Sequence, residues 1–314
     1  MRRRASALKV AFRKDGGTMR FDLTRRELLV GGGALLAVAC APARNVAAPK
    51  SEPDPFGDLE ASIGGRVGVF ALDIGSQRVL ARRADERFAM CSTFKWVLAA
   101  CVLARVDKRE VALEQRVAYG EADLLEHAPA ARANVATGSM TVEALAEAAV
   151  TISDNTAANL LLSLVGGPAG LTAFVRGLGD DVTRLDRTEP TMNTNPPNDA
   201  RDTTSPRAMV GTMKAVLLGD VLARASRDRL EGWLVACKTG LERLRAGLPA
   251  GYMAGDKTGT GENGAVNDLA IVRPPGRSPI LIASYLSDGA AGVARSSAAH
   301  AAIARTVVGR FEPR

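Results

Sequence analysis

Hydrophobic and polar residues alternate in short runs near both ends of the chain, and this period-two pattern predicts β-strands. Near the start, Arg66–Asp73 and 78–82 lie on either side of a Gly-Ser-Gln turn. Near the end, 252–260 is extended, and 269–272 and 279–285 flank a Pro-Pro-Gly-Arg turn. Because both ends contain hairpins, we expect one antiparallel sheet with strands from both ends of the chain.

The middle of the chain changes to the three- and four-residue spacing of helices. Thr141 and Ser226 are expected to cap helices, Ser205-Pro206 opens another, and Gly166-Gly167-Pro168 stops one. The helices predicted in this way cover 58–63, 92–106, 141–150, 155–165, 171–178, 205–218, 226–236 and 293–308. The predicted fold class is α/β plus all-α, an antiparallel sheet flanked by helices with an inserted helical domain.

The change of pattern also predicts the domain boundaries. The α/β domain is expected to comprise 55–90 and 237–314, and the helical domain 91–236. Residues 40–54, rich in alanine and proline, read as a flexible linker. Residues 1–39 read as an export signal, for the reasons given below.

Most of the positive charge belongs to the start of the chain. The formal net charge is +7, from 41 Lys and Arg against 34 Asp and Glu. Residues 1–39 contain nine basic and three acidic residues, a net of +6, which leaves +1 for the rest. Nucleic acid is therefore not an expected partner. The two histidines, His127 and His300, are too few and too far apart for a zinc site, so neither a metal nor a cofactor is expected.

The first 39 residues contain a paired-arginine motif, Thr24–Leu29, and resemble a twin-arginine signal. The apolar run at 28–38 is too short for a stable membrane span, and small residues suitable for cleavage follow it. We therefore expect an exported, periplasmic protein. Met19 could be the true start, and Cys40 after the small residues leaves open a lipid anchor.

Candidate chemistry begins at Ser92, the first residue of a predicted helix, with Lys95 three positions later. A serine at a helix start meets free backbone N–H groups, and a lysine one turn on can reach its oxygen. This arrangement could activate the hydroxyl as a nucleophile. Alone it is weak evidence, since a capping serine beside a solvated lysine has the same spacing.

Further polar motifs strengthen the nucleophile hypothesis. Ser153-Asp154-Asn155 lies in a break between two predicted helices, and Lys257-Thr258-Gly259 lies in an extended segment. Glu189 and Asn193 start a long irregular stretch, 190–206, and such loops are often functional. A second Lys-Thr-Gly, 238–240, closes a predicted helix, so we interpret it as structural, with Gly240 ending that helix.

Together and in this order, the motifs resemble those of the class A β-lactamases, which are serine penicillin-recognising enzymes. The resemblance covers about residues 55–310 and includes the stretch from Ile152 to Leu162. It implies hydrolysis of the β-lactam ring of penicillins and cephalosporins. We also expect a monomer with a small-molecule substrate, without a cofactor or a stable membrane span.

The resemblance also implies residue roles. Ser92 would attack the lactam carbonyl, with backbone N–H groups of Ser92 and Thr260 stabilising the oxyanion. Glu189 with Asn193 would activate water for deacylation. Whether Lys95 or Glu189 accepts the serine proton is disputed for the family.

The departing ring nitrogen would receive its proton through Ser153 with Lys257 beside it. The residues expected to bind substrate are Asn155, Asn193, Thr258, Gly259, Thr260, Arg243 and His127. Arg187 and Asp202 are also expected to form an ion pair. This pair would join the two ends, or neck, of the long loop that contains Glu189.

One position departs from carbapenem-hydrolysing relatives. They pair the cysteine before the nucleophile, here Cys91, with a cysteine just after Lys-Thr-Gly. Gly261 occupies that second position, so the disulfide is not expected and activity on carbapenems stays open.

Two other functions share most of the motifs. A penicillin-binding D-alanyl-D-alanine carboxypeptidase or transpeptidase would use the same serine and lysines, but it would lack a base placed for water. A catalytically silent sensor would keep only the fold. The Glu189-Pro-Thr-Met-Asn193 motif favours hydrolysis.

Overall fold

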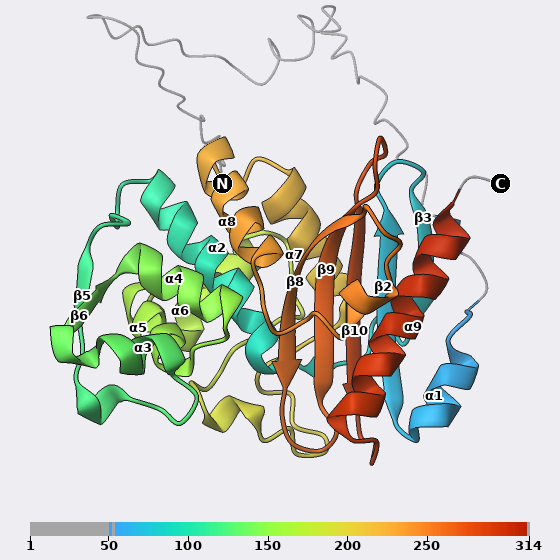
Figure 1. Cartoon of the computed structure of the whole chain (residues 1–314), viewed down its shortest axis with the longest axis horizontal. Helices are drawn as coiled ribbons and strands as arrows, with labels where there is room; N and C mark the ends of the chain where they lie inside the picture. The colour runs from blue at the N-terminus through green and yellow to red at the C-terminus, as the bar shows by residue number, and fades with distance from the viewer. Residues whose placement is uncertain (1–49, 52–53, 313–314) are drawn as a thin grey trace, which may run out of the picture. The chain divides into compact units, whose positions relative to one another are not determined.

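A six-stranded sheet forms the centre of the structure, and its strands come from both ends of the sequence, as predicted (Figure 1). The computed structural model describes residues 50–51 and 54–312. The strand order is β1-β3-β2-β10-β9-β8, antiparallel except for the pair β1–β3. The bounds are β1 Lys50–Ser51, β2 Arg66–Asp73, β3 Arg78–Arg82, β8 Met253–Thr260, β9 Val266–Arg273 and β10 Ile280–Ser287. The predicted leader, with Met19 and Cys40, lies outside the described residues.

The sheet is covered on both faces, and alternate residues of one strand show how. On β2, Val69 and Ala71 pack in a cluster with the closing helix α9 (Val293–Phe311) and α1 (Gly57–Ile63). Phe70 and Leu72 point to the opposite cluster, which contains the central helices. A strand buried on both faces is almost wholly hydrophobic, so the alternation of hydrophobic and polar residues was only weak evidence for β2.

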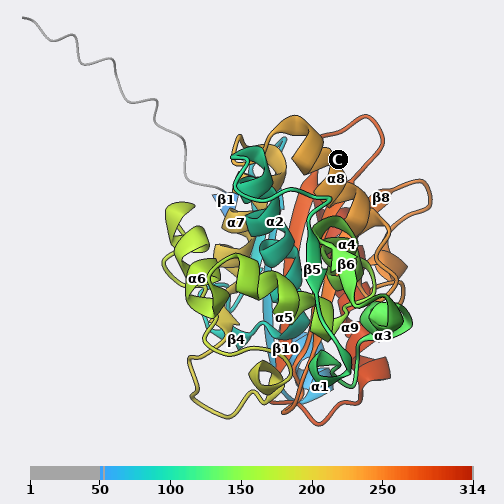
Figure 2. The same cartoon turned by 90° about the vertical axis from the view of Figure 1, so that its left-hand side faces the viewer.

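The central helices lie together on one side of the sheet, as Figure 2 shows for α2, α4, α5 and α6. Their bounds are α2 Phe94–Asp107, α3 Pro129–Asn134, α4 Val142–Thr151, α5 Asn155–Leu164, α6 Gly167–Gly177, α7 Pro206–Leu218 and α8 Arg224–Val235. Two-stranded ribbons join β4 (Phe88–Ala89) to β7 (Thr203–Thr204) and β5 (Arg116–Ala118) to β6 (Ser139–Thr141). Helix α7 packs on β10 and β2, and α8 on β8. The division into an α/β and a helical domain stays a prediction.

Two expected caps are present and one is wrong. Thr141 accepts the N–H of Ala144, and Ser205 accepts the N–H of Ala208. Ser226 lies inside α8 and does not cap it. Its hydroxyl donates to Asp107 at the end of α2, and the same carboxylate accepts the N–H of Ala223. A carboxylate from another helix therefore takes the place of a local cap.

The Gly166-Gly167-Pro168 motif, which was predicted to end one helix, also begins the next helix, α6. Gly166 has φ 87° and Gly167 has φ 69°, and α6 begins at Gly167, four residues earlier than predicted. Proline at the first turn of a helix loses no hydrogen bond, so Pro168 is compatible with both roles.

Acidification is expected to destabilise the protein through His300, which is fully buried between Ser284 and the carbonyl oxygen of Val266. Burial, and then the charge of Arg243, lower the pKa of His300 to about 3 from 6.5. The unfolded chain takes up the proton below pH 6.5, so stability falls as pH drops from 6.5 towards 3. His300 alone is expected to change the free energy of unfolding by about 1.4 kcal/mol per pH unit in this range.

The denaturant midpoint should therefore depend less steeply on pH in the His300→Asn variant than in the wild type. The exposed His127 provides the control, and His127→Asn should keep the wild-type slope; equal slopes for all three would contradict the assignment.

Candidate active site

Ser92 lies in a 3₁₀ turn, Cys91–Thr93, that directly precedes α2, so it is not the first residue of the α-helix as predicted. Cys91 has φ 46°, a left-handed conformation that is costly for a non-glycine residue. Strand β8 runs close behind the turn. A Cβ at Gly259 would lie 2.6 Å from the carbonyl oxygen of Met90 and 3.2 Å from the amide nitrogen of Ser92. Glycine is therefore required for this approach.

Lys95 is fully buried, which excludes the solvated-lysine interpretation. Its Nζ lies 3.0 Å from Glu189 Oε1 and donates to Asn155 Oδ1 at 2.5 Å. It also lies 2.8 Å from the carbonyl oxygen and 3.3 Å from the Oγ of Ser153. Burial lowers the pKa of Lys95, and the Glu189 carboxylate opposes this shift. The amine is therefore easier to deprotonate than an exposed lysine.

Ser153 is aimed into the site by its backbone, which has φ 61°. The buried Asp154 caps α5 by accepting the N–H of Ala157, and it also accepts the N–H groups of Ala130 and Ala131. This carboxylate therefore fixes the break between α4 and α5. The Ser153 hydroxyl then lies 3.1 Å from Lys257 Nζ.

Glu189 reaches the same point from the long loop. Its Oε1 lies 3.3 Å from Ser92 Oγ, and its Oε2 accepts from Asn193 Nδ2 at 2.5 Å. Asn159, one turn after Asn155 on α5, grips the Glu189 backbone by accepting its N–H at 3.0 Å and donating to its carbonyl at 2.9 Å. Sequence reasoning missed Asn159, although its helical spacing from Asn155 places both on one face.

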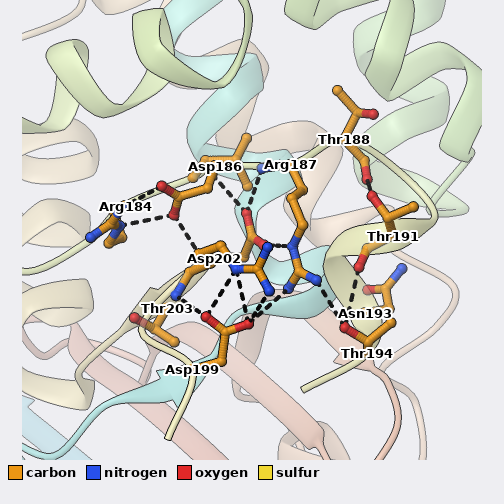
Figure 3. A network of polar contacts seen from close by, with 12 residues as sticks. Arg184, Asp186, Arg187, Thr188, Thr191, Asn193, Thr194, Asp199, Asp202 and Thr203 are labelled. Carbon is orange, nitrogen blue, oxygen red and sulfur yellow. Dashed lines mark hydrogen bonds and ion pairs between the residues drawn. The ribbon is translucent and has the colours of Figure 1, made fainter. Parts of the chain in front are cut away.

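The neck of the loop contains the predicted pair of Arg187 and Asp202 (Figure 3). Arg187 Nε lies 2.5 Å from Asp202 Oδ2, and the Asp202 side chain is fully buried. Asp202 Oδ1 accepts the N–H groups of Asp186 and Arg187, and Asp186 Oδ2 accepts the N–H of Asp202. The two ends of the loop are therefore tied by both side chains and backbone.

Lys257 and Arg243 bring positive charge to the opposite wall. Burial lowers the pKa of Lys257 to about 8. Arg243 is buried, and its guanidinium donates to Thr260 Oγ1 and to the carbonyls of Gly259 and Asn267. The cleft has a volume of about 320 Å³ and is lined by Ser92, His127, Ser153, Asn155, Asn193, Thr239, Arg243, Thr258, Gly259 and Thr260. A second pocket, of about 500 Å³, is lined in part by residues 195–200, and none of the predicted site residues lines it.

The geometry agrees with what known proteins show. The model of the beta-lactamase enzyme family matches residues 56–311. A class A β-lactamase structure described as ancestral is 54% identical, with TM-score 0.80, and the match covers 81% of this chain and 97% of that one. The chain belongs to the class A β-lactamases.

Individual relatives of this class A β-lactamase come from several bacteria. Beta-lactamase AST-1 of Nocardia asteroides is 50% identical over 73% of this chain and 74% of its own length. Carbapenem-hydrolyzing beta-lactamase KPC of Klebsiella oxytoca is 48% identical over 74% of this chain and 79% of its own. A putative class A β-lactamase structure from Rhodopseudomonas palustris is 50% identical, with TM-score 0.79, and the match covers 81% of this chain and 97% of that chain.

The prediction that Gly240 ends α8 is wrong for this β-lactamase, because α8 ends at Val235. Gly240 is not among the residues with positive φ, so it does not end α8 in the expected way. A Cβ at Gly240 would overlap the Asp256 carboxylate. Thr239 lines the cleft, and its Oγ1 lies 2.6 Å from Thr258 Oγ1. The segment therefore forms a wall of the site, which its local sequence did not indicate.

His127 and Cys91 occupy the edges of the site. His127 is exposed, lines the cleft and contacts the carbonyl oxygen of Ile152 at 3.1 Å. Cys91, Cys101 and Cys237 are the free cysteines of the described residues. Gly261 lies next to Cys91, and a Cβ at Gly261 would be 2.7 Å from Cys91 Sγ. Glycine has no thiol, so Cys91 has no partner for a disulfide at this position.

Over residues 50–51 and 54–312, no group of three or more His, Cys, Asp and Glu could hold a metal ion. In the same residues no single helix is long and apolar enough to cross a membrane, although the bent pair α5–α6 passes a test of length and composition.

Proposed function

We propose that this β-lactamase hydrolyses the lactam ring of penicillins and cephalosporins through an acyl-enzyme on Ser92. The observation that carries the proposal is the position of Glu189. Its carboxylate contacts Ser92 Oγ, Lys95 Nζ and Asn193 Nδ2 at 3.3, 3.0 and 2.5 Å, although Ser92 lies 97 residues before Glu189 in the chain. One buried base beside both the nucleophile and an amide is suited to activating water.

In acylation, Ser92 Oγ bonds to the lactam carbonyl carbon, and the carbon–nitrogen bond of the ring breaks. The hydrogen bond of Ser92 to Glu189 favours Glu189 as acceptor of the serine proton. The ring nitrogen receives a proton through Ser153, which lies between Lys95 and Lys257. Thr258, Thr260 and Arg243 hold the substrate carboxylate, since a guanidinium fork fits that group.

In deacylation, a water held by Glu189 and Asn193 attacks the ester carbonyl. Glu189 takes the water proton, and Ser92 leaves with a proton as the open-ring acid is released. The Asn159 grip on the Glu189 backbone holds the base in place. A penicillin-binding protein with the same serine and lysines would have no such base.

Incubation with a chromogenic cephalosporin is expected to give many turnovers per enzyme molecule. A burst of one product per enzyme would instead indicate the penicillin-binding alternative, and no reaction would indicate a silent module. Ser92→Ala serves as the control and should be inactive, because it removes the nucleophile.

The paired arginines of residues 1–39 support a further proposal, twin-arginine export to the periplasm. The mature protein acts there as a monomer on a diffusible substrate; a lipid anchor at Cys40 is the alternative to a freely diffusing enzyme. These residues lie outside the described part of the chain. Replacing Arg25 and Arg26 by lysine should keep the enzyme in the cytoplasmic fraction.

A further inference from the structure

Asn267, in strand β9, contacts the segment that leads into the turn with the nucleophile. Asn267 is fully buried, and its Nδ2 donates to the carbonyl oxygens of Ala89 at 2.9 Å and of Met90 at 3.2 Å. These are the last two residues before the Cys91–Thr93 turn, which contains Ser92. One side chain of the sheet therefore holds the chain where it enters the nucleophile turn.

The opposite residue on strand β8 makes this contact possible. Asn267 is opposite Gly259 in the register of β8 and β9, so the two residues face the same side of the sheet. A Cβ at Gly259 would lie 2.6 Å from the Met90 carbonyl oxygen, the same oxygen that accepts from Asn267. Because Gly259 has no side chain, the Met90 carbonyl can approach the sheet closely enough for the Asn267 amide to bind it.

The orientation of the Asn267 amide follows from its partners. Both carbonyl oxygens can only accept hydrogen bonds, so the nitrogen end of the amide faces them. The amide oxygen, Oδ1, has no hydrogen-bond donor among residues 50–51 and 54–312. A buried acceptor without a donor destabilises the folded state, and an apolar side chain of similar size would avoid that cost. The amide at this position is therefore explained by what its nitrogen binds.

The nucleophile turn needs support from outside. Cys91 has φ 46°, a left-handed conformation that persists in a non-glycine residue only where its surroundings hold it. The Met90 carbonyl also accepts the N–H and the hydroxyl of Thr93, at 3.2 and 2.8 Å. Those two bonds close the turn locally, whereas the bonds from Asn267 fix the turn relative to strand β9.

We propose that Asn267 is a positioning residue for the oxyanion hole, a step that rests on the proposed function. In the proposed mechanism, the hole comprises the N–H groups of Ser92 in the turn and of Thr260 in β8. Strand pairing places Thr260 opposite Val266, next to Asn267, and the Asn267 amide ties the turn to the same part of β9. Asn267 thereby sets the separation of the two N–H groups, which decides how well both reach the carbonyl oxygen of the substrate.

The backbone of Asn267 contacts a different wall of the site. Its carbonyl oxygen accepts from Arg243 Nη1 at 2.6 Å, and a substitution of the side chain retains that bond. Loss of the amide should therefore affect the reacting carbonyl of the substrate much more than the binding of the substrate carboxylate.

The infrared spectrum of a trapped acyl-enzyme tests the proposal. In Glu189→Ala, an isotope label at the lactam carbonyl of a penicillin identifies the ester band by difference. Hydrogen bonds from the oxyanion hole polarise the ester carbonyl and lower its stretching frequency. Asn267→Leu in this background removes the donor at similar volume and should shift the ester band to higher wavenumber. Asn267→Ser, whose hydroxyl is too short to replace the amide, should give the same shift if the leucine variant fails to fold.

Ser284→Ala in the same background is the matched control. Ser284 is buried in strand β10, and its hydroxyl forms a hydrogen bond with His300. This control loses a buried hydrogen bond of the sheet but should keep the ester band at the frequency seen in Glu189→Ala alone. An ester band at that same frequency in the folded Asn267 variants would overturn the proposal.

A boronic acid gives a second readout that needs neither turnover nor deacylation. Ser92 Oγ bonds to the boron of phenylboronic acid and releases its proton to Glu189, and the tetrahedral anion places an oxygen in the oxyanion hole. Asn267→Leu in the otherwise wild-type enzyme should weaken this binding about tenfold, because one N–H group is displaced but not lost. Equal affinities for wild type and variant would overturn the proposal. A Glu189→Ala enzyme that forms no ester, with boronate binding still weakened by Asn267→Leu, would fault the proposed function alone.

Discussion

A Glu189→Ala variant is expected to form the acyl-enzyme with a penicillin and then retain it. Acylation should slow as well, because Glu189 is the favoured acceptor of the serine proton, but Lys95, whose pKa burial lowers, remains in the site near Ser153 and can take that proton instead. Deacylation loses its general base, which typically contributes 10²–10⁴-fold to a rate, so turnover should fall by about that factor. Intact-mass spectrometry should show the protein mass increased by one drug molecule.

A matched control is available next to the cleft. Glu262 is exposed, and its backbone N–H, not its side chain, contacts Asn193. Glu262→Ala should turn over normally and show no adduct after the substrate is consumed. Complete absence of an adduct in Glu189→Ala, with the variant folded, would contradict the role given to Glu189.

Asp202→Ala is expected to loosen the loop that carries Glu189 and to slow deacylation. The Asp202 side chain is fully buried and accepts three hydrogen bonds at 2.5–2.9 Å, two from backbone amides and one from Arg187 (Figure 3). Removing one partner of a buried pair leaves the other uncompensated, at a cost of about 3–5 kcal/mol. The acyl-enzyme lifetime, followed by stopped-flow and mass spectrometry, should lengthen, and the thermal midpoint should fall.

An Asp199→Ala variant is the control. It tests whether the effect of Asp202→Ala comes from the buried pair or from the loss of any negative charge in the loop. Asp199 pairs with Arg201 and lies 3.9 Å from Arg187, at a more exposed position. Asp199→Ala should therefore change the lifetime and the thermal midpoint much less. An unchanged acyl-enzyme lifetime in Asp202→Ala would reject the link between the neck and Glu189.

The sequence was most informative where local pattern and function coincide. Hairpins at both ends predicted the sheet, and Thr141 and Ser205 predicted helix starts that the structure confirms. The motifs containing Ser92, Ser153 and Lys257 were named before any geometry, and the structure brings them into one cleft. Their spacing along the chain is large, so resemblance to a family was needed to predict that they meet.

What the sequence did not reveal depends on tertiary contacts. Asp107 caps a helix that begins more than a hundred residues later, so no local signal marks it. Thr239 enters the cleft because β8 places Thr258 beside it, and Gly240 is required by the Asp256 carboxylate. The four-residue spacing between Asn155 and Asn159 could have predicted that both lie on the same face of α5. Only the folded loop shows that Asn159 holds Glu189.

The most direct test is a crystal structure of Glu189→Ala soaked with a penicillin. The account predicts continuous density from Ser92 Oγ to the opened lactam carbonyl, with the drug carboxylate against Thr258, Thr260 and Arg243. An adduct on another residue, or a drug carboxylate that points away from this wall, would contradict it.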